Sequence, residues 1–270
     1  PVSIIMPARN EEEGIVDAVR SMLQLRYANL EIIVVNDGSG DATLERLNEA
    51  FGLTPVPISL PRMLQTETIR GCYLSSSQPR LRVLDKAAGG KADALNAGIN
   101  ASVYPLIFCA DADCVLDRDA LLHLAQHFIL DPDTVACGGT RLPQNGNVVR
   151  EGHLVEAALP HGRMERIQLV ENLRDALLIC AGWSSVNGLL LLSGNIMLLQ
   201  KQAVIDCGGF LRDLVDEDGE LILRMHRLLS IAGKPYRIAH SSNALGWAEV
   251  PRDRSKLRAS RVRRYRGLCE

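Results

Sequence analysis

Two aspartates one residue apart close the apolar segment PLIFCADADC at residues 105–114. The run 106–110 has the length and composition of a strand that is buried on both faces. In extended chain, Asp111 and Asp113 would point to the same side, roughly 7 Å apart. Two carboxylates there are costly unless a cation shares them. The spacing therefore predicts either a metal or phosphate site or the cap of the helix that follows.

Polar turns follow four predicted strands in succession. The turns read PARN, NDGS, GGK and DAD, in chain order. Ligands of open α/β sheets bind at the carboxyl ends of the strands. Four such turns together favour a cleft for a nucleotide or a sugar along one edge of the sheet.

Strands and helices alternate in the first 110 residues. The predicted strands are 2–6, 30–35, 80–85 and 106–110, and the predicted helices are 11–25, 41–51 and 91–101. This alternation indicates a parallel sheet with helices on both faces. Four prolines and a serine triplet between 52 and 79 predict an exposed insertion or long loop.

The pattern loosens beyond residue 135. TVACGG, TRLPQNGNVV, PYRIAH and NALGWAEV indicate short strands, and 164–181 and 216–233 indicate helices. The uncharged run 176–200 is interrupted by serines, asparagines and glycines, so we interpret it as a helix end, a turn and a buried strand at 189–192 rather than a membrane span. We expect one two-lobed domain over 1–270, with a nucleotide-binding half at 1–115, a second half at 116–251 and a basic helix at 252–270.

Charge and composition narrow the classes of ligand. The net charge of −2 gives no indication of nucleic acid, and seven cysteines without a CxxC pair suit a reducing compartment rather than structural zinc. Residues 252–266 carry eight Lys and Arg against one Asp, which predicts an anionic ligand or a membrane surface nearby. Dinucleotide, P-loop, GxSxG and HExxH motifs are absent from the sequence. His123 and His127 are read as part of a solvated helix face.

Six motifs in order resemble inverting family-two glycosyltransferases. They are PVSIIMPARNEEEGI, EIIVVNDGSGDAT, DKAAGGKADALNAGI, CADADCVLD, LLSGNIMLL and VDEDGELILRMHR. The likeness is greatest to the cytosolic catalytic domain of membrane-embedded poly-N-acetylglucosamine, chitin, hyaluronan and cellulose synthases, and it covers nearly the whole chain. It implies the GT-A fold, a mixed and mostly parallel central sheet with helices on both faces, a nucleotide-binding N-terminal half and an acceptor-binding C-terminal half.

The resemblance also implies roles for individual residues. The donor nucleotide would lie on Pro7, Arg9, Asn10, Glu12, Asp37, Lys91 and Asp111, with Asp37 on the uracil. Asp113 would hold Mg²⁺ or Mn²⁺ on the diphosphate, and Gly194, Asn195 and Glu217 would face the acceptor. Asp218 aligns with the catalytic base, while Asp216 is expected to cap the helix that follows.

One motif departs from the pattern of the processive synthases. Their QxxRW motif aligns with Ser260–Arg264, without its glutamine and tryptophan. Arg261, Arg263 and Arg264 still suit a diphosphate. The departure leaves processive elongation open, and a catalytically degenerate binding or receptor module of a membrane complex is the alternative. A sugar-phosphate nucleotidyltransferase would instead show a Gly-rich loop after strand one.

The resemblance places the enzyme in polysaccharide synthesis at the inner membrane, with this domain facing the cytoplasm. A UDP-sugar of the UDP-N-acetylglucosamine or UDP-glucose type would be the donor, and a glycan or a lipid-linked hydroxyl would be the acceptor. The chain starts without Met and stops after a basic helical stripe. We therefore expect transmembrane helices in the full protein on at least one side of it, with the stripe near lipid headgroups.

Overall fold

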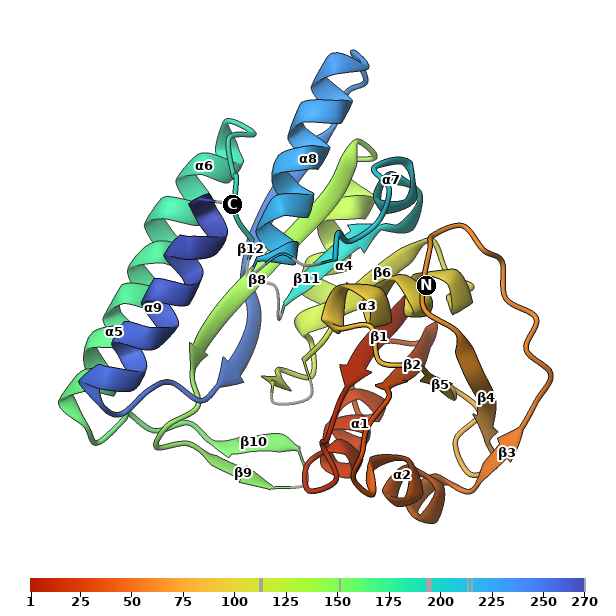
Figure 1. The fold of residues 1–270 in the computed structure, drawn as a ribbon. Coiled ribbons are helices and arrows are strands. Elements are labelled where there is room, and N and C mark those ends of the chain that lie inside the picture. The colour runs from red at the N-terminus through yellow and green to blue at the C-terminus, as the bar shows by residue number, and fades with distance from the viewer. Residues whose placement is uncertain (112–113, 151, 193–195, 213, 215, 270) are drawn as a thin grey trace.

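The computed structural model describes residues 1–270 except 112–113, 151, 193–195, 213, 215 and 270, and it leaves the side chains of 264, 268 and 269 undescribed. A ten-stranded sheet crosses the molecule in the order β3-β4-β5-β2-β1-β6-β11-β8-β12-β7 (Figure 1). The N-terminal strands are β1 (Val2–Ala8), β2 (Leu30–Asp37), β3 (Leu53–Pro55), β4 (Ile69–Ser75), β5 (Leu81–Lys86) and β6 (Leu106–Cys109). The later sheet strands are β7 (Val115–Leu116), β8 (Thr134–Pro143), β11 (Met197–Gln200) and β12 (Arg237–Ala248).

The direction of pairing changes at β6. Strands β5, β2, β1 and β6 are parallel, whereas β11 runs antiparallel to both β6 and β8. The sheet is therefore mixed and mostly parallel in its N-terminal half, as predicted. Asp111, the first residue of the DAD motif, follows β6 at this change of direction.

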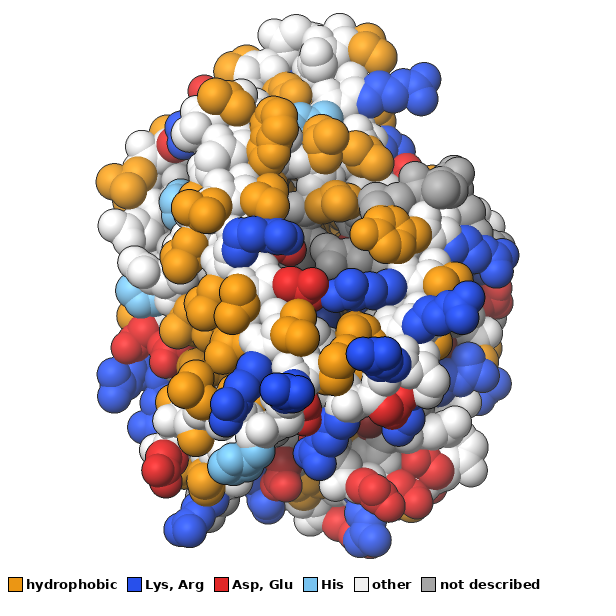
Figure 2. Space-filling model, turned by 90° about the vertical axis from the view of Figure 1, so that its left-hand side faces the viewer, with side chains coloured by type: hydrophobic (Ala, Val, Ile, Leu, Met, Phe, Trp, Pro, Cys, Tyr) orange, Lys and Arg blue, Asp and Glu red, His pale blue; other side chains and the backbone are white. Residues whose placement is uncertain are grey.

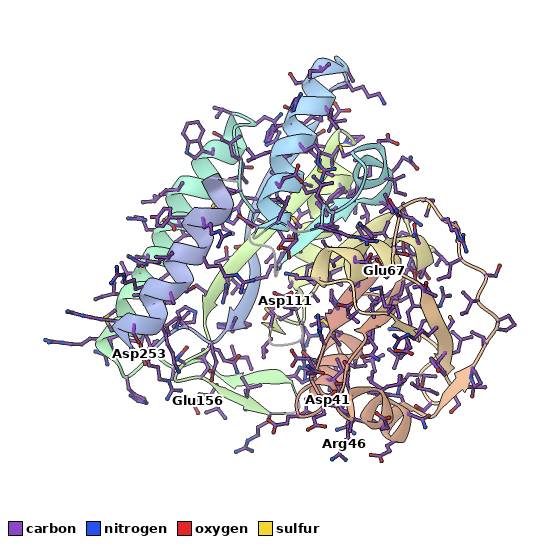
Figure 3. All side chains as sticks on the ribbon, viewed as in Figure 1. Asp41, Arg46, Glu67, Asp111, Glu156 and Asp253 are labelled. Carbon is purple, nitrogen blue, oxygen red and sulfur yellow. The ribbon has the colours of Figure 1, made fainter. Side chains whose placement is uncertain are left out.

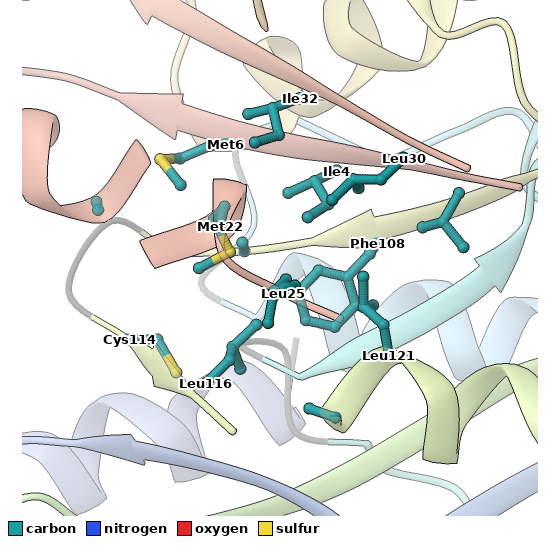
Figure 4. Packing of buried hydrophobic residues seen from close by; sticks show 14 of the residues in the cluster. Ile4, Met6, Met22, Leu25, Leu30, Ile32, Phe108, Cys114, Leu116 and Leu121 are labelled. Atoms are coloured by element: carbon teal, nitrogen blue, oxygen red, sulfur yellow. The ribbon is translucent and has the colours of Figure 1, made fainter. Parts of the chain in front are cut away.

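Helices cover both faces of the sheet because its strands are apolar on both. Along β1, Ile4 and Met6 pack on one side with α1 (Ile15–Leu23) and α4 (Ala120–Leu130), as Figure 4 shows in part. Ile5, between them, packs on the other side with α3 (Lys91–Ala101) and α8 (Glu217–Ile231). The remaining helices and the small hairpin are α2 (Thr43–Phe51), α5 (Arg163–Arg174), the π-helix η1 (Asp175–Cys180), α6 (Ala181–Ser185), α7 (Lys201–Asp206), α9 (Arg254–Cys269), β9 (Val148–Arg150) and β10 (His153–Glu156).

Close packing of α3 on β1 depends on one glycine. A Cβ built at Gly98 would overlap the side chain of Ile5, which is fully buried. The helix can therefore lie against the strand only where residue 98 has no side chain. This contact fixes the height of α3, and so of its N-terminus, over the carboxyl end of the sheet.

Two predictions about the chain path are wrong. Residues 52–79 are not simply an exposed loop: β3 and β4 extend the sheet as antiparallel strands, and Leu64 is buried against α3. Residues 189–192 are not a strand, because the strand that pairs with β6 is β11 at 197–200. The first prediction failed because the prolines between 52 and 79 indicated a loop. The second failed because 189–192 lie in an uncharged run whose hydrophobicity has neither a helical nor a strand period.

Three other elements are longer than predicted. Strands expected at TVACGG and TRLPQNGNVV form one strand, β8, as far as Pro143, and the end of the second segment belongs to β9. Those at PYRIAH and NALGWAEV are one strand, β12, with an irregularity between His240 and Leu245. The helix predicted at 164–181 continues through the π-helix to Ser185. No helix in the described part of the chain is both long enough and apolar enough to cross a bilayer.

Candidate active site

One lysine gathers carboxylates from both halves of the sheet. Lys91 is the first residue of α3, and its Nζ lies 3.1 Å from Oδ1 of Asp111, at the end of β6. The same Nζ lies 3.3 Å from Oε1 of Glu217 and 3.5 Å from Oδ2 of Asp218, in the first turn of α8. Figure 3 shows Asp111 near the middle of the molecule, below the N-terminus of α8. The structure thus brings together four residues that were predicted to form the site.

Asp218 is buried where it would have to act. Its residue is 9% exposed, and its Oδ1 has no hydrogen-bond partner among the described residues. Burial, opposed by Lys91 and reinforced by Glu217 and Asp111, raises the pKa of Asp218 to about 6. A carboxylate whose pKa is raised toward neutrality, and which has one oxygen without a hydrogen-bond partner among the described residues, suits a general base.

Asp216 holds the start of α8 in place. It is the N-cap residue, and its Oδ1 accepts a hydrogen bond from the backbone N–H of Gly219 at 3.3 Å. Glu217 and Asp218 follow in the first turn, where the positive end of the helix dipole favours carboxylates. The predicted capping role of Asp216 is confirmed, whereas the role of Asp218 as catalytic base stays a prediction.

The charge balance around Lys91 favours a further cation. Burial alone would lower the pKa of Lys91, but Asp218, Asp111 and Glu217 outweigh it and raise the pKa above its usual range. Three carboxylates around one ammonium leave an excess of negative charge, and oxygen ligands of this kind suit Mg²⁺ or Mn²⁺. The described residues contain no ready-made group of three His, Cys, Asp or Glu for a metal. Asp113, the predicted ligand, lies outside the described residues, as do Gly194 and Asn195.

The capping alternative for the DAD motif fails for its first aspartate. Helix α4 begins at Ala120 with Asp119 as its N-cap residue. Strand β7 lies between the motif and this helix, so Asp111 does not cap it. Asp111 instead forms an ion pair with Lys91.

The loop after β1 is bound to the loop after β2. The backbone N–H of Asn10 donates to Ser39 Oγ at 3.0 Å, and Asn10 Oδ1 accepts from the N–H of Gly40 at 2.8 Å. Glu12 Oε2 accepts from the N–H of Ala42 at 2.9 Å. Asn10 and Glu12 therefore hold these two loops together, and their direct contact with a nucleotide stays a prediction. Of the other nucleotide-binding residues predicted in this loop, Arg9 is exposed and Pro7 is half-buried near the end of β1.

Asp37 lies beneath the GGK turn and is bound to its backbone. It is 2% exposed, and its carboxylate accepts the backbone N–H groups of Gly89 and Gly90 at 2.9 and 2.8 Å. Its Oδ1 also accepts from Lys86 Nζ at 2.6 Å. These bonds hold the turn that carries Lys91, while the predicted contact between Asp37 and uracil stays a prediction.

The predicted diphosphate arginines lie on α9, beside α5. Arg261 Nη2 pairs with Oε2 of Glu171, on α5, at 2.6 Å, so this arginine fastens the two helices together. Arg263 is exposed, and the side chain of Arg264 is not described. Their contact with a diphosphate stays a prediction. Sequence reasoning missed Lys86, Asp93 and Arg212, although a lysine ending the apolar strand VLDK was a signal that a buried counter-charge exists.

The sequence matches the profile described as "Glycosyl transferase family 2" over residues 3–61 and 64–184. It is 28% identical over 267 residues to a poly-beta-1,6-N-acetyl-D-glucosamine synthase of Staphylococcus aureus strain COL, covering 98% of this chain and 54% of that protein. A synthase of the same name from Staphylococcus epidermidis is 27% identical over 268 residues, with the same coverage. The chain thus spans about half the length of the curated relatives it matches.

Two solved structures share the fold over most of the chain. A mannosyltransferase from Pyrobaculum calidifontis, in complex with GDP-Man and Mn²⁺, superposes with a TM-score of 0.65 at 19% identity, covering 99% of this chain and 61% of that one. TarS residues 1–349 of S. aureus, in complex with UDP-GlcNAc, superposes with a TM-score of 0.56 at 17% identity, covering 93% and 59%. At such identities these likenesses show the fold alone.

Proposed function

This chain belongs to glycosyl transferase family 2, and from that premise we propose that it is the catalytic domain of an inverting, metal-dependent glycosyltransferase. The donor would be a UDP-sugar, and the acceptor a hydroxyl of a glycan or a lipid-linked sugar. The observation that carries the proposal is the meeting of Lys91, Asp111, Glu217 and Asp218 at one point between the two halves of the sheet. A donor diphosphate needs cations there, and an acceptor hydroxyl needs a base.

The residues divide the reaction between them. Asp218 accepts the proton of the acceptor hydroxyl, and the freed oxygen lone pair forms a bond to the anomeric carbon. The bond between that carbon and the diphosphate oxygen breaks as the new bond forms, so one displacement inverts the centre. Lys91 faces the departing UDP, and its positive charge stabilises the negative charge that develops on the diphosphate. A divalent cation held by Asp113, with Asp111 beside it, would supply further neutralisation of the leaving group.

The finer assignment of the donor rests on the relatives. The curated relatives are named as synthases of poly-N-acetylglucosamine, and TarS was captured with UDP-GlcNAc. We therefore propose UDP-N-acetylglucosamine before UDP-glucose, and polysaccharide synthesis as the setting. The mannosyltransferase with GDP-Man has the same fold, so the fold alone does not determine which nucleobase the donor carries.

Calorimetry of UDP binding tests the metal part of the proposal. We expect Mn²⁺ to tighten UDP binding by the parent protein and Asp113→Asn to remove that gain, because a neutral amide holds a divalent cation far less well. Asp133→Asn, at an exposed position before β8, is the matched control and should behave as the parent. Equal UDP affinity for Asp113→Asn and the parent in saturating Mn²⁺ would remove Asp113 from the site.

We further propose that the protein works at the inner membrane with this domain on the cytoplasmic side. Figure 2 views the side that α5, α6 and α9 form, where hydrophobic side chains gather with Lys and Arg among them. The exposed apolar side chains of this side include Val170 (66%), Leu178 (69%) and Trp183 (56%). Apolar groups bordered by cations suit the boundary between headgroups and acyl chains of an anionic bilayer.

Flotation with anionic vesicles tests the membrane proposal. Binding should fade as salt rises, and it should weaken both on deletion of residues 252–270 and in the double variant Val170→Ser, Leu178→Ser. Ile129→Ser is the control, because Ile129 is 79% exposed at the end of α4, away from α5 and α9. Vesicle binding that survives both the deletion and the double variant would contradict the proposal.

The altered QxxRW region supports a second candidate, a degenerate module that binds a ligand without turnover. Ser260 stands where the motif has glutamine, and Arg261 is engaged by Glu171. UDP release from UDP-N-acetylglucosamine by the full-length protein decides between the two. UDP binding without any release would favour the binding module.

A further inference from the structure

A lysine is sealed beneath the turn that carries Lys91. Lys86, the last residue of β5, is fully buried, and its Nζ lies 2.6 Å from Asp37 Oδ1 and 2.5 Å from Asp93 Oδ2. The third donor of the ammonium goes to the carbonyl oxygen of Ala87 at 2.6 Å. All three donors of the lysine are therefore used, and two carboxylates from different elements converge on it.

Arg212 completes this network from the C-terminal half. Its Nη2 pairs with Asp93 Oδ1, and its Nη1 donates to Glu67 Oε1 at 2.9 Å. Lys86 and Arg212 together balance the charges of Asp37 and Asp93. Without the exposed Glu67, these four charges sum to zero, and each of the two buried aspartates has a cationic partner, which is the condition for keeping charges in a protein interior.

Helix α3 joins the network to the segment before α8. Lys91 begins the helix, and one turn further along Asn96 binds the backbone of Phe210 in both directions, with Nδ2 to the carbonyl and Oδ1 from the N–H, each at 2.8 Å. The segment that contains Phe210 is in turn held by α8. Arg224 of that helix donates to the carbonyl of Gly209 at 2.8 Å and pairs with Glu220 at 2.6 Å. A continuous set of contacts therefore runs from α3 to the helix that carries Asp218.

We propose that Lys86 and Arg212 are positioning residues that, through Asp37 and Asp93, hold the GGK turn and the segment before α8 in the one relation that brings Lys91 beside Asp218. Lys86 sets the turn itself, because Asp37 binds the N–H groups of Gly89 and Gly90. Arg212 sets the distance between the two halves, because it links Asp93 of α3 to a segment of the acceptor half. Neither residue touches the carboxylates that surround Lys91.

A merely stabilising network would make a different pattern from a positioning one. A buried ion pair as a whole often adds little stability and is best attested as selecting one arrangement, whereas removing one partner costs stability when the other charge is left buried and unpaired. Arg212 is 31% exposed, so its loss leaves Asp93 paired with Lys86 and partly reached by water. Its replacement should leave the fold intact and relax the relation between the halves. Replacement of Lys86 should disturb the turn as well.

The inference rests on the proposed glycosyl transfer, and two variants test it in the full-length protein. Arg212→Gln should lower kcat for UDP release at least tenfold, while its UDP affinity stays within threefold of the parent. Its Tm should match that of the control variant. Arg212→Lys keeps a positive charge beside Asp93 and should recover most of kcat. Arg237→Gln is the control, since Arg237 forms an exposed ion pair with Asp131 at 3.5 Å. Lys86→Met should lose UDP affinity as well as kcat.

Hydrogen exchange reads the same network without any turnover. The amides of Gly89 and Gly90 should exchange faster in Lys86→Met, and the amide of Glu67, which donates to Asp93 at 3.0 Å, should exchange faster in Arg212→Gln. Parental kcat in Arg212→Gln, or a loss of kcat that only follows a loss of folded protein, overturns the inference. If Lys86→Met does not fold, the Arg212 variants still decide it. A parent protein that neither binds nor releases UDP refutes the proposed function instead, while exchange still reports on the network.

Discussion

Replacement of Lys91 by Met should move the acidic limb of the pH–rate profile upward. Asp218 can accept a proton only when ionised, so kcat/KM falls as the pH drops through its pKa, which is about 6 with Lys91 in place. The ammonium of Lys91 lies 3.5 Å from Asp218 Oδ2 and favours the ionised form. Without it, the carboxyl protonates at a higher pH.

The size of the shift follows from the geometry. An opposite charge within 4–6 Å changes the pKa of a carboxyl by about 1 to 3 units. Lys91 also serves Asp111 and Glu217, and its side chain is 36% exposed, so water screens part of its effect. We therefore expect the lower end of that range, about one unit, or about 1.4 kcal/mol.

The assay is the initial rate of UDP release from the full-length protein at subsaturating donor, from pH 5 to pH 8. The position of the limb is independent of the lower maximal rate that Lys91→Met will also cause. Lys234→Met, at an exposed lysine beyond α8, should keep the limb of the parent. A limb that stays in place or moves to lower pH in Lys91→Met would refute the assignment of this limb to Asp218.

Two further changes differ in their expected effects on stability. Asp218→Asn should abolish UDP release without lowering Tm at neutral pH in scanning calorimetry, because burial raises the pKa of this carboxyl and a neutral amide avoids that cost; retained turnover would transfer the role of base to Glu217. Gly98→Ala should lower the free energy of unfolding by about 1–3 kcal/mol in urea titrations, because its Cβ overlaps Ile5. Gly14→Ala, with open space around it, should stay within about 0.5 kcal/mol of the parent, and equal losses in the two would contradict the packing argument.

The N-terminal half could be predicted from the sequence because its strands are buried on both faces. The apolar run at 2–6 became β1, and the helix predicted at 91–101 has those same bounds. The pairing of Asp93 with Arg212 could not be predicted, since no local pattern connects residues so far apart in the chain. Nor could β11, because the uncharged stretch before it gives neither a helical nor a strand period.

The site shows the same division. The spacing of the DAD motif indicated a cation partner for Asp111, and the structure supplies one in Lys91. Nothing in the sequence indicated that the carboxylate of Asp37, predicted to contact uracil, binds the turn that precedes Lys91. Local motifs therefore identified which residues gather around Lys91, whereas the contacts among them depend on how distant segments pack.

The pairing of β6 with β11 sets the order in which this protein can be completed on the ribosome. Cys109, at the end of β6, finds its partner Met197 on the order of ninety residues later. At the usual speed of synthesis that is a wait on the order of ten seconds, during which one edge of a hydrophobic strand has no neighbour. The nascent chain must keep that edge from pairing with another chain, so slow codons or a pause between residues 110 and 196 would lengthen the interval in which it can aggregate.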